Sequence, residues 1–250
     1  MKSYLTALLL VITSVSFSQF SYNYVMQMDP LCAGACDGYV EVQLTGGTFP
    51  YNVNITPFGP MTPINDSTFY AFGVCAGTWF IESTDALSAT ADTIVNLFDP
   101  PFLTLNTSST DESCFSSCDG TITLGAIGGA PPFMFSIDNG VTWQPTGIFT
   151  NLCAGSYDVH VQDANGCLGS SVLVVNSPGL MAATFPSVTD DCGGACNGTA
   201  SAIATGGTGF FTWMWSDGQT TATAFNLCAG TFNVWITDGN GCVAIDSVTI

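Results

Sequence analysis

Three segments of the chain share one cysteine frame, and this repetition restricts the possible folds more than any other feature. Each segment begins with a Cys-x3-Cys-[Asp/Asn]-Gly motif, which reads CAGACDG at Cys32, CFSSCDG at Cys114 and CGGACNG at Cys192. A Gly-Gly pair follows ten residues after each second cysteine, and a third cysteine follows in VCAGTWF, LCAGSYD and LCAGTFN. Fourteen residues later comes a fourth cysteine, Cys167 or Cys242, which Ala89 replaces in the first segment. Matches in constant order and spacing predict three tandem repeats.

The stretches between these motifs have the pattern of β-strands. Inward-facing and outward-facing residue types alternate within the segments GYVEVQL, GTITLGA, GTASAIA and SYDVHVQ. The turns DANG and DGNG end in Asn-Gly, the preferred pair for tight hairpins. No stretch has sustained helical periodicity. We therefore expect an all-β fold in which each repeat is an immunoglobulin-like β-sandwich of about seven strands. A propeller is disfavoured because its blades are shorter than these repeats.

Pro-containing junctions, DPPF at 99–102 and NSPG at 176–179, separate the repeats. We assign residues 19–100 to repeat 1, 101–179 to repeat 2, and 180–250 to repeat 3, which we expect to be truncated at its C-terminal end. These names are kept below. Aromatic side chains are expected to fill the space between the sheets, and they are Tyr51, Phe133, Phe135, Trp213 and Trp215.

The N-terminus has the features of a secretory signal. Lys2 supplies a positive charge, an apolar run extends from Tyr4 to Val15, and Ser16 and Ser18 offer a small-residue cleavage site. The apolar run is too short for a membrane span. We expect residues 1–18 to be a signal peptide and the mature chain to begin near Gln19. The protein is then expected to be secreted or displayed on the outer cell surface, without direct membrane insertion.

Removal of the signal peptide also removes Lys2, which is the only Lys or Arg in the chain, whereas Asp and Glu number 19. Nucleic-acid binding depends on cationic side chains that neutralise phosphates, so it is excluded. Anionic membrane surfaces are excluded for the same reason. Because no ion pair with Lys or Arg can form, the fold must depend on apolar burial, β-ladders and cross-links.

Eleven cysteines in an exported chain indicate disulfides rather than zinc ligands. Cysteines four residues apart on extended chain are too far apart to join, so long-range pairs are favoured. The first repeat lacks the fourth cysteine but keeps the second and third, so we pair second with third and first with fourth. The alternative pairs first with third and second with fourth. The predicted bonds are Cys36–Cys75, Cys118–Cys153, Cys196–Cys228, Cys114–Cys167 and Cys192–Cys242. Cys32 is then a free thiol near the mature N-terminus, where it could link the chain to a partner.

Two stretches of the chain, CDGTITLGAIGGAPPFMFSIDNG and TNLCAGSYDVHVQDANGC, resemble the SprB-type repeat of large surface adhesins in gliding Bacteroidetes. The resemblance extends over nearly all of the chain from Cys32, although STDALSA replaces the Asp-x-Asn-Gly-Cys turn in repeat 1. It implies export, through the type IX pathway of that phylum, display on the cell surface and a role linked to gliding motility.

No arrangement of residues predicts catalysis, so we expect the chain not to be an enzyme. His160 is the sole histidine and alternates with Val159 and Val161, as an outward-facing strand residue does. The adjacent carboxylates Asp111-Glu112 and Asp190-Asp191 would point to opposite faces of a strand, which does not suit glycoside hydrolysis.

Calcium is the one cofactor that the sequence leaves open. Four aspartates at turns are candidate oxygen ligands, namely Asp37, Asp119, Asp163 and Asp238. Turn aspartates more often accept hydrogen bonds from their own backbone. The aromatic residues Tyr70, Trp79 and Trp235 could stack on sugar rings or, alternatively, pack on the sheets.

The predicted function is a cell-surface adhesin, or a filament or stalk protein, whose repeats provide length and multivalent attachment. The expected partners are an extracellular glycan or protein surface, with self-association into filaments as a further expectation. The alternative is a spacer or carbohydrate-binding accessory region of a larger secreted hydrolase.

Overall fold

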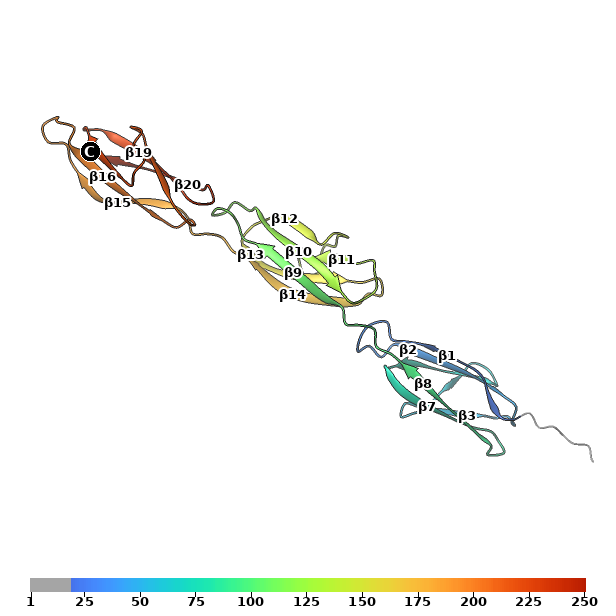
Figure 1. Cartoon of the computed structure of the whole chain (residues 1–250). Helices are drawn as coiled ribbons and strands as arrows, with labels where there is room; N and C mark the ends of the chain where they lie inside the picture. Colours follow the sequence, from blue (N-terminus) through green and yellow to red (C-terminus); the bar gives the residue numbers. More distant parts are fainter. Residues whose placement is uncertain (1–18) are drawn as a thin grey trace, which may run out of the picture. The chain divides into compact units, whose positions relative to one another are not determined.

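The computed structural model describes residues 19–250, so the predicted signal peptide and its cleavage site at residues 1–18 lie outside the described residues. Residues 19–250 form strands and turns throughout, which confirms the all-β fold class (Figure 1). Within this range no helix is long and apolar enough to cross a membrane. The chain divides into two compact units, one ending at Phe102 and the other comprising Leu103–Ile250.

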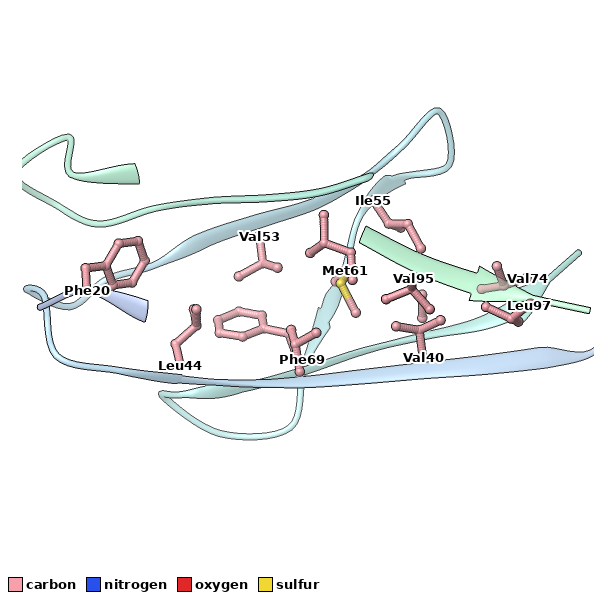
Figure 2. Close-up of a cluster of buried hydrophobic side chains, with 13 residues drawn as sticks. Phe20, Val40, Leu44, Val53, Ile55, Met61, Phe69, Val74, Val95 and Leu97 are labelled. Carbon is pink, nitrogen blue, oxygen red and sulfur yellow. The ribbon is translucent and has the colours of Figure 1, made fainter. Parts of the chain in front are cut away.

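The strands of repeat 1 form two four-stranded antiparallel sheets, ordered β1-β2-β6-β5 and β4-β3-β7-β8. The strands are β1 Ser21–Met28, β2 Gly38–Thr45, β3 Asn52–Thr56, β4 Gly59–Pro60, β5 Thr62–Pro63, β6 Thr68–Val74, β7 Gly77–Thr84 and β8 Thr90–Leu97. Figure 2 shows the side chains that fill the space between these sheets, with Val40 and Leu44 on one side and Val53 and Ile55 on the other. The two sheets therefore form a sandwich around one core.

Repeats 2 and 3 form the second unit, and each has two three-stranded antiparallel sheets. In repeat 2 the orders are β12-β10-β9 and β11-β13-β14, and in repeat 3 they are β15-β16-β18 and β17-β19-β20. The strands of repeat 2 are β9 Thr104–Thr110, β10 Gly120–Ile127, β11 Met134–Ser136, β12 Ile148–Leu152, β13 Gly155–Gln162 and β14 Leu168–Val175. Those of repeat 3 are β15 Ala182–Thr189, β16 Gly198–Thr205, β17 Thr212–Trp215, β18 Thr223–Leu227, β19 Thr231–Thr237 and β20 Val243–Thr249. These are immunoglobulin-like β-sandwiches.

The alternating sequence pattern explains which side chains are buried. On β2, every second residue from Gly38 is buried, because successive side chains on a strand point to opposite faces. Trp215 fills the core of repeat 3 with 1% of its surface exposed, and its indole N–H donates to the Thr221 carbonyl at 2.9 Å. The N–H of Trp215 thus has the partner that a buried indole needs.

The glycine of each Cys-x3-Cys-[Asp/Asn]-Gly motif begins a strand where the two sheets approach closely. At Gly120, a Cβ atom would lie 2.6 Å from the Val175 side chain and 2.9 Å from the Leu152 carbonyl. Gly198 would meet Ile250 and the Leu227 carbonyl in the same way. Only glycine fits here, so this end of β14 or β20 lies against the start of β10 or β16.

Two isoleucines on β10 test the sandwich directly. Ile122 is fully buried, whereas Ile127 on the same strand is 56% exposed. We expect Ile122→Ala to lower the local stability of repeat 2 by about 2–5 kcal/mol, because it leaves a cavity in the core. Ile127→Ala should change it by no more than about 0.5 kcal/mol. Hydrogen–deuterium exchange of the repeat 2 amides measures both effects, and equal effects from the two substitutions would contradict the assigned core.

Candidate functional site

The first and fourth cysteines of a repeat lie at opposite ends of its sandwich. In repeat 3, Cys192 precedes the start of β16 at Gly198. Cys242 ends the turn between β19 and β20, and this turn is held to the far end of β16 because Thr208 N–H donates to Asp238 at 2.8 Å. An eight-residue strand is about 26 Å long. Disulfide-bonded residues have Cα atoms no more than about 7 Å apart, so these two cysteines cannot join.

The predicted pairs Cys114–Cys167 and Cys192–Cys242 are therefore wrong. Cys114 of repeat 2 is instead bonded to Cys242 of repeat 3, with their Cα atoms 5.6 Å apart and a sequence separation of 128. Cys167 is also disulfide-bonded, but not to Cys114. The prediction of a free thiol at Cys32 is wrong as well, because Cys32 is disulfide-bonded. Within residues 19–250 the free cysteine is Cys192, and it is exposed.

The pairs of second with third cysteines agree with the prediction. The structure joins Cys36 to Cys75, Cys118 to Cys153 and Cys196 to Cys228, with Cα separations of 3.9, 3.8 and 3.8 Å. Each bond lies at the end of a sheet, next to the pairings of β2 with β6, β10 with β12 and β16 with β18. These bonds fasten two neighbouring strands of one sheet, whereas the Cys114–Cys242 bond fastens two repeats.

A hydrogen bond accompanies the disulfide between repeats 2 and 3. The side-chain amide of Asn240 donates to the Ser113 carbonyl at 2.9 Å, and the Cys242 sulfur lies 3.3 Å from the same oxygen. Asn240 belongs to the Asp-Gly-Asn-Gly-Cys turn, and Ser113 immediately precedes Cys114. The Asn of the turn therefore does more than form the hairpin, because it also contacts the neighbouring repeat.

The peptide link between the two repeats is anchored at both ends. Asn176 accepts the Glu112 N–H at 2.9 Å through its carbonyl and donates its own N–H to Asp111 at 2.8 Å. Gly179 accepts the Gly207 N–H at 2.8 Å. The chain thus leaves repeat 2 at the end that bears Cys114 and enters repeat 3 at the end that bears Cys242. Repeats 2 and 3 are joined by two covalent connections at one junction.

Two of the calcium candidates, Asp163 and Asp238, organise the turns that carry the fourth cysteines. The Asp238 carboxylate accepts the N–H groups of Thr208, Asn240 and Cys242 at 2.8 to 2.9 Å. Asp163 accepts the equivalent N–H groups in repeat 2, namely those of Ala130, Asn165 and Cys167, each at 2.9 Å. Both side chains are 6% exposed. These carboxylates thus fix the fourth-cysteine turn against the Gly-Gly turn of the same repeat.

Repeat 1 shows that the carboxylate has a structural role even without the fourth cysteine. Asp85 accepts the N–H groups of Thr48, Leu87 and Ala89 at 2.8 to 2.9 Å. Burial raises the pKa of Asp85 and of Asp238, but the backbone hydrogen bonds outweigh it and leave both pKa values below their usual range. Both carboxylates therefore remain charged on the folded protein, with backbone N–H groups as their partners.

The other two calcium candidates, Asp37 and Asp119, each accept hydrogen bonds from the loop that bears the first cysteine. Asp37 accepts the Leu31 N–H at 3.0 Å, and Asp119 accepts the Ser113 N–H at 2.8 Å. Hydrogen bonds from the Ser113 and Ser117 hydroxyls and the Ser113 N–H lower the pKa of Asp119 to about 2. Asp119 thus positions Ser113, whose carbonyl accepts the bond from Asn240.

The four aspartates do not form one cluster of ligands, because each is engaged by its own loop. One group in the described chain has the spacing of metal ligands, formed by Glu112, Cys118 and Cys153. Its two sulfurs are joined in a disulfide and supply no thiolate. Glu112 instead accepts the N–H groups of Cys118 and Ala154 at 3.0 and 3.1 Å and so supports that disulfide.

His160 and the three aromatic residues considered for sugar binding have neighbours within the sheets. The Nε2 atom of His160 lies 3.0 Å from the Asn139 side-chain oxygen. Trp79 donates its N–H to the Cys75 carbonyl at 2.9 Å and meets Phe58 edge to face. Tyr70 stacks with Tyr39, and Trp235 is partly buried on β19. His160 pairs with Ser170 across β13 and β14, and it lines one shallow pocket together with Asp158, Ser170 and Ser171.

Sequence reasoning missed the junction, although one signal for it was present. Suppose that the first cysteine of each repeat pairs with the fourth cysteine of the following repeat. Repeat 1 then needs no fourth cysteine, and the first cysteine of repeat 3 has no partner among the three repeats. Ala89 and the free Cys192 fit that pattern. Pairing within single repeats instead predicts an orphan at Cys32.

The fold and the disulfides together define a class of protein. The chain consists of β-sandwiches in which ten of the eleven cysteines are disulfide-bonded, which indicates an extracellular or surface-exposed protein. The family model of the SprB repeat matches residues 106–142 and 184–220, so the chain carries SprB-type repeats and the predicted resemblance is confirmed. Among curated proteins, none matches the sequence significantly.

Solved structures with a similar arrangement include proteins of several kinds. A C-terminal fragment of intimin in complex with the translocated intimin receptor is 14% identical, with a TM-score of 0.34. That match covers 65% of this chain and 66% of the fragment, just under two thirds of its length. A Dscam structure is 11% identical over 93% of this chain and 72% of its own, with a TM-score of 0.28. A tetra-tandem repeat from the extending region of a large adhesion protein is 15% identical, with 92% and 72% covered and a TM-score of 0.25. At these low scores, none of them identifies a partner.

Titration of Asp119 tests the hydrogen bonds that hold the Cys114 loop. Because the pKa of Asp119 is about 2 in the folded protein and 3.8 ordinarily, its ionised form stabilises the fold above pH 3.8. That stability should be lost as the pH falls through about 2. We expect Ser113→Ala and Ser117→Ala each to raise the pKa towards 3.8, whereas Ser109→Ala on β9 should not. Carboxyl NMR shifts measure this, and an unchanged pKa in both loop variants would refute the assigned contacts.

Proposed function

We propose that the chain is a non-enzymatic region of a secreted cell-surface adhesin, and that its disulfide-joined repeats serve as a spacer that carries load. The observation that carries this proposal is the bond between Cys114 and Cys242. The SprB-type repeats at 106–142 and 184–220 fit an adhesin-type repeat region. Secretion and a link to gliding motility form part of the proposal because the repeat type implies them.

The junction supports a mechanical role. Residues between Cys114 and Cys242 form a closed covalent loop that contains most of repeats 2 and 3. Tension that enters repeat 2 before Cys114 and leaves repeat 3 after Cys242 passes through the disulfide rather than through the β-ladders. The β-ladders therefore bear little of the load. A spacer of this kind suits attachment by many weak contacts, in which each repeat gains avidity from its neighbours.

The surface supports binding to a neutral or cationic partner. On β7 and β8 of repeat 1, Phe80 pairs with Ile94, and their side chains are 53% and 55% exposed. Glu82 pairs with Asp92 on the same two strands, and these four side chains line one shallow pocket. Because the chain has no Lys or Arg after Lys2, the proposed partner is an extracellular protein or glycan surface with apolar and cationic groups. Self-association into filaments would have to overcome the like charge of the copies.

An adhesion assay tests this function. Beads coated with the full chain are retained under flow on polystyrene, on chitosan (a cationic polysaccharide) and on dextran, a neutral one. We expect retention several-fold above albumin-coated beads on the first two surfaces, with chitosan retention falling as salt screens the charges. Retention no greater than that of albumin beads on every surface would refute the adhesive role. Hydrolysis of a peptide, ester or glycoside that is lost on His160→Ala would refute the non-enzymatic role.

The load-bearing role makes a separate prediction for the junction. We expect Cys114→Ser combined with Cys242→Ser to shorten the rotational correlation times of repeats 2 and 3, because each repeat would then turn more freely about the peptide link. The matched control is Cys36→Ser with Cys75→Ser, which removes a bond inside repeat 1 and should leave repeats 2 and 3 unchanged. NMR relaxation of backbone amides measures this. Unaltered correlation times in the junction variant would show that the disulfide does not stiffen the junction.

A further inference from the structure

Cys192 occupies the position in repeat 3 at which Cys114 of repeat 2 forms a disulfide with the next repeat. It is the first cysteine of repeat 3, is exposed, and is the free cysteine of residues 19–250. The counterpart Cys114 is bonded across a junction to Cys242, and the first cysteine of repeat 1, Cys32, is disulfide-bonded too. Two of the three equivalent positions are thus cross-linking positions, and the third carries an unused thiol.

Two features near Cys192 match those near Cys114. Ile250 lies against Gly198 at this end of repeat 3, as Val175 lies against Gly120 in repeat 2. The neighbouring disulfide Cys196–Cys228 takes the place of Cys118–Cys153. This is therefore the end of the sandwich at which the chain leaves the repeat, and in repeat 2 the next repeat is docked at that end.

The loop that carries Cys192 has equivalent residues but a different hydrogen bond, because Asp119 accepts the N–H of the residue before the cysteine and Asn197 accepts that of the cysteine itself. The Cys192 N–H donates to the Asn197 side-chain oxygen at 2.9 Å, and Asn197 occupies the position of Asp119. Asp191 occupies the position of Ser113, so its carbonyl corresponds to the oxygen that accepts the Asn240 amide. The acceptor in repeat 2 is a backbone atom, which the change from Ser to Asp preserves.

The complementary element is an Asp-x-Asn-Gly-Cys turn. This chain contains two such turns, which end at Cys167 and Cys242, and both cysteines are already disulfide-bonded. Repeat 1 has Ala89 at this position and offers no thiol. An Asp-x-Asn-Gly-Cys turn that bonds to Cys192 would therefore belong to a repeat additional to these three.

We propose that Cys192 is a covalent docking site for the Asp-x-Asn-Gly-Cys turn of a further SprB-type repeat that continues from Ile250 as repeat 3 continues from Val175. The incoming Asn donates its side-chain amide to the Asp191 carbonyl, and the incoming cysteine bonds to Cys192. The two thiols lose two protons and two electrons in forming the disulfide, and a small-molecule disulfide takes them up to give two thiols. The site depends on the junction geometry and does not require that the chain be an adhesin.

The test extends the chain with its own junction. Residues 176–250 are repeated after Ile250, so that Asn176 of the added copy follows Ile250 as it follows Val175. Cys192 of the added copy is replaced by Ser, so that the original Cys192 is the one thiol in question. After oxidation with glutathione disulfide, we expect alkylatable thiols to fall from two per chain, at Cys192 and the added Cys242, to none. Mass spectrometry should find Cys192 joined to the added Cys242.

Two controls make the result decisive. Cys242→Ala in the added copy should restore one alkylatable thiol at Cys192 and leave the Cys114–Cys242 bond intact.

A second arm uses the unextended chain with Cys114→Ser, which frees Cys242, and mixes it at high concentration with the original chain. A bond between Cys192 of one molecule and Cys242 of another is then expected, and it shows that the site also accepts a turn from a second molecule. A thiol that persists at Cys192 in both arms, or a bond from Cys192 to any other cysteine, overturns the proposal.

Discussion

The constraint on which this structure depends is that a β-sandwich places its first and fourth cysteines at opposite ends. The distance is set by strand length, about 26 Å for the eight residues of β16, and no local adjustment can close it. The first and fourth cysteines of one repeat therefore cannot pair with each other. In repeats 2 and 3 a partner in the neighbouring repeat is available because the peptide link of residues 176–179 brings the exit end of one sandwich to the entry end of the next. The bond between Cys114 and Cys242 follows from this arrangement.

The chain has no Lys or Arg after Lys2, so its carboxylates must be stabilised by groups other than those cations. Carboxylates cannot pair with those cations, so the turn aspartates are held by converging backbone N–H groups. Asp85, Asp163 and Asp238 each receive three such bonds between the Gly-Gly turn and the hairpin turn. In repeat 3 the same carboxylate shapes the turn that presents Asn240 and Cys242 to Ser113 and Cys114. Two of the aspartates considered as calcium ligands, Asp119 and Asp238, thus serve the junction between repeats 2 and 3.

The sequence allowed the parts of the fold that depend on local pattern to be predicted. The alternation of residue types predicted the strands. The predicted inward aromatic residues also lie at the cores: Phe135 and Trp215 are buried, and Tyr51, Phe133 and Trp213 each pack against the core of their own repeat. The pairs of second with third cysteines could also be inferred, because repeat 1 keeps both of them and lacks the fourth. The spacing of the first and fourth cysteines within a repeat could not reveal their partners, since the choice depends on which end of a folded sandwich each turn occupies. The signal that the sequence does hold is the pattern of cysteines across repeats, with Ala89 in the first and an unpaired Cys192 in the last.

A disulfide inside a repeat and one between repeats differ in what they stabilise. In the chain-entropy model, closing a loop of 128 residues contributes about 5 kcal/mol. That contribution is available only when both sandwiches are folded and docked, because Cys114 and Cys242 belong to different repeats. The bond Cys196–Cys228 closes a shorter loop and requires only repeat 3 to be folded. The junction bond therefore couples the folding of neighbours, so that loss of one repeat weakens the next. A tandem array joined in this way gains cooperativity at its junctions, where repeat proteins otherwise depend on noncovalent interfaces.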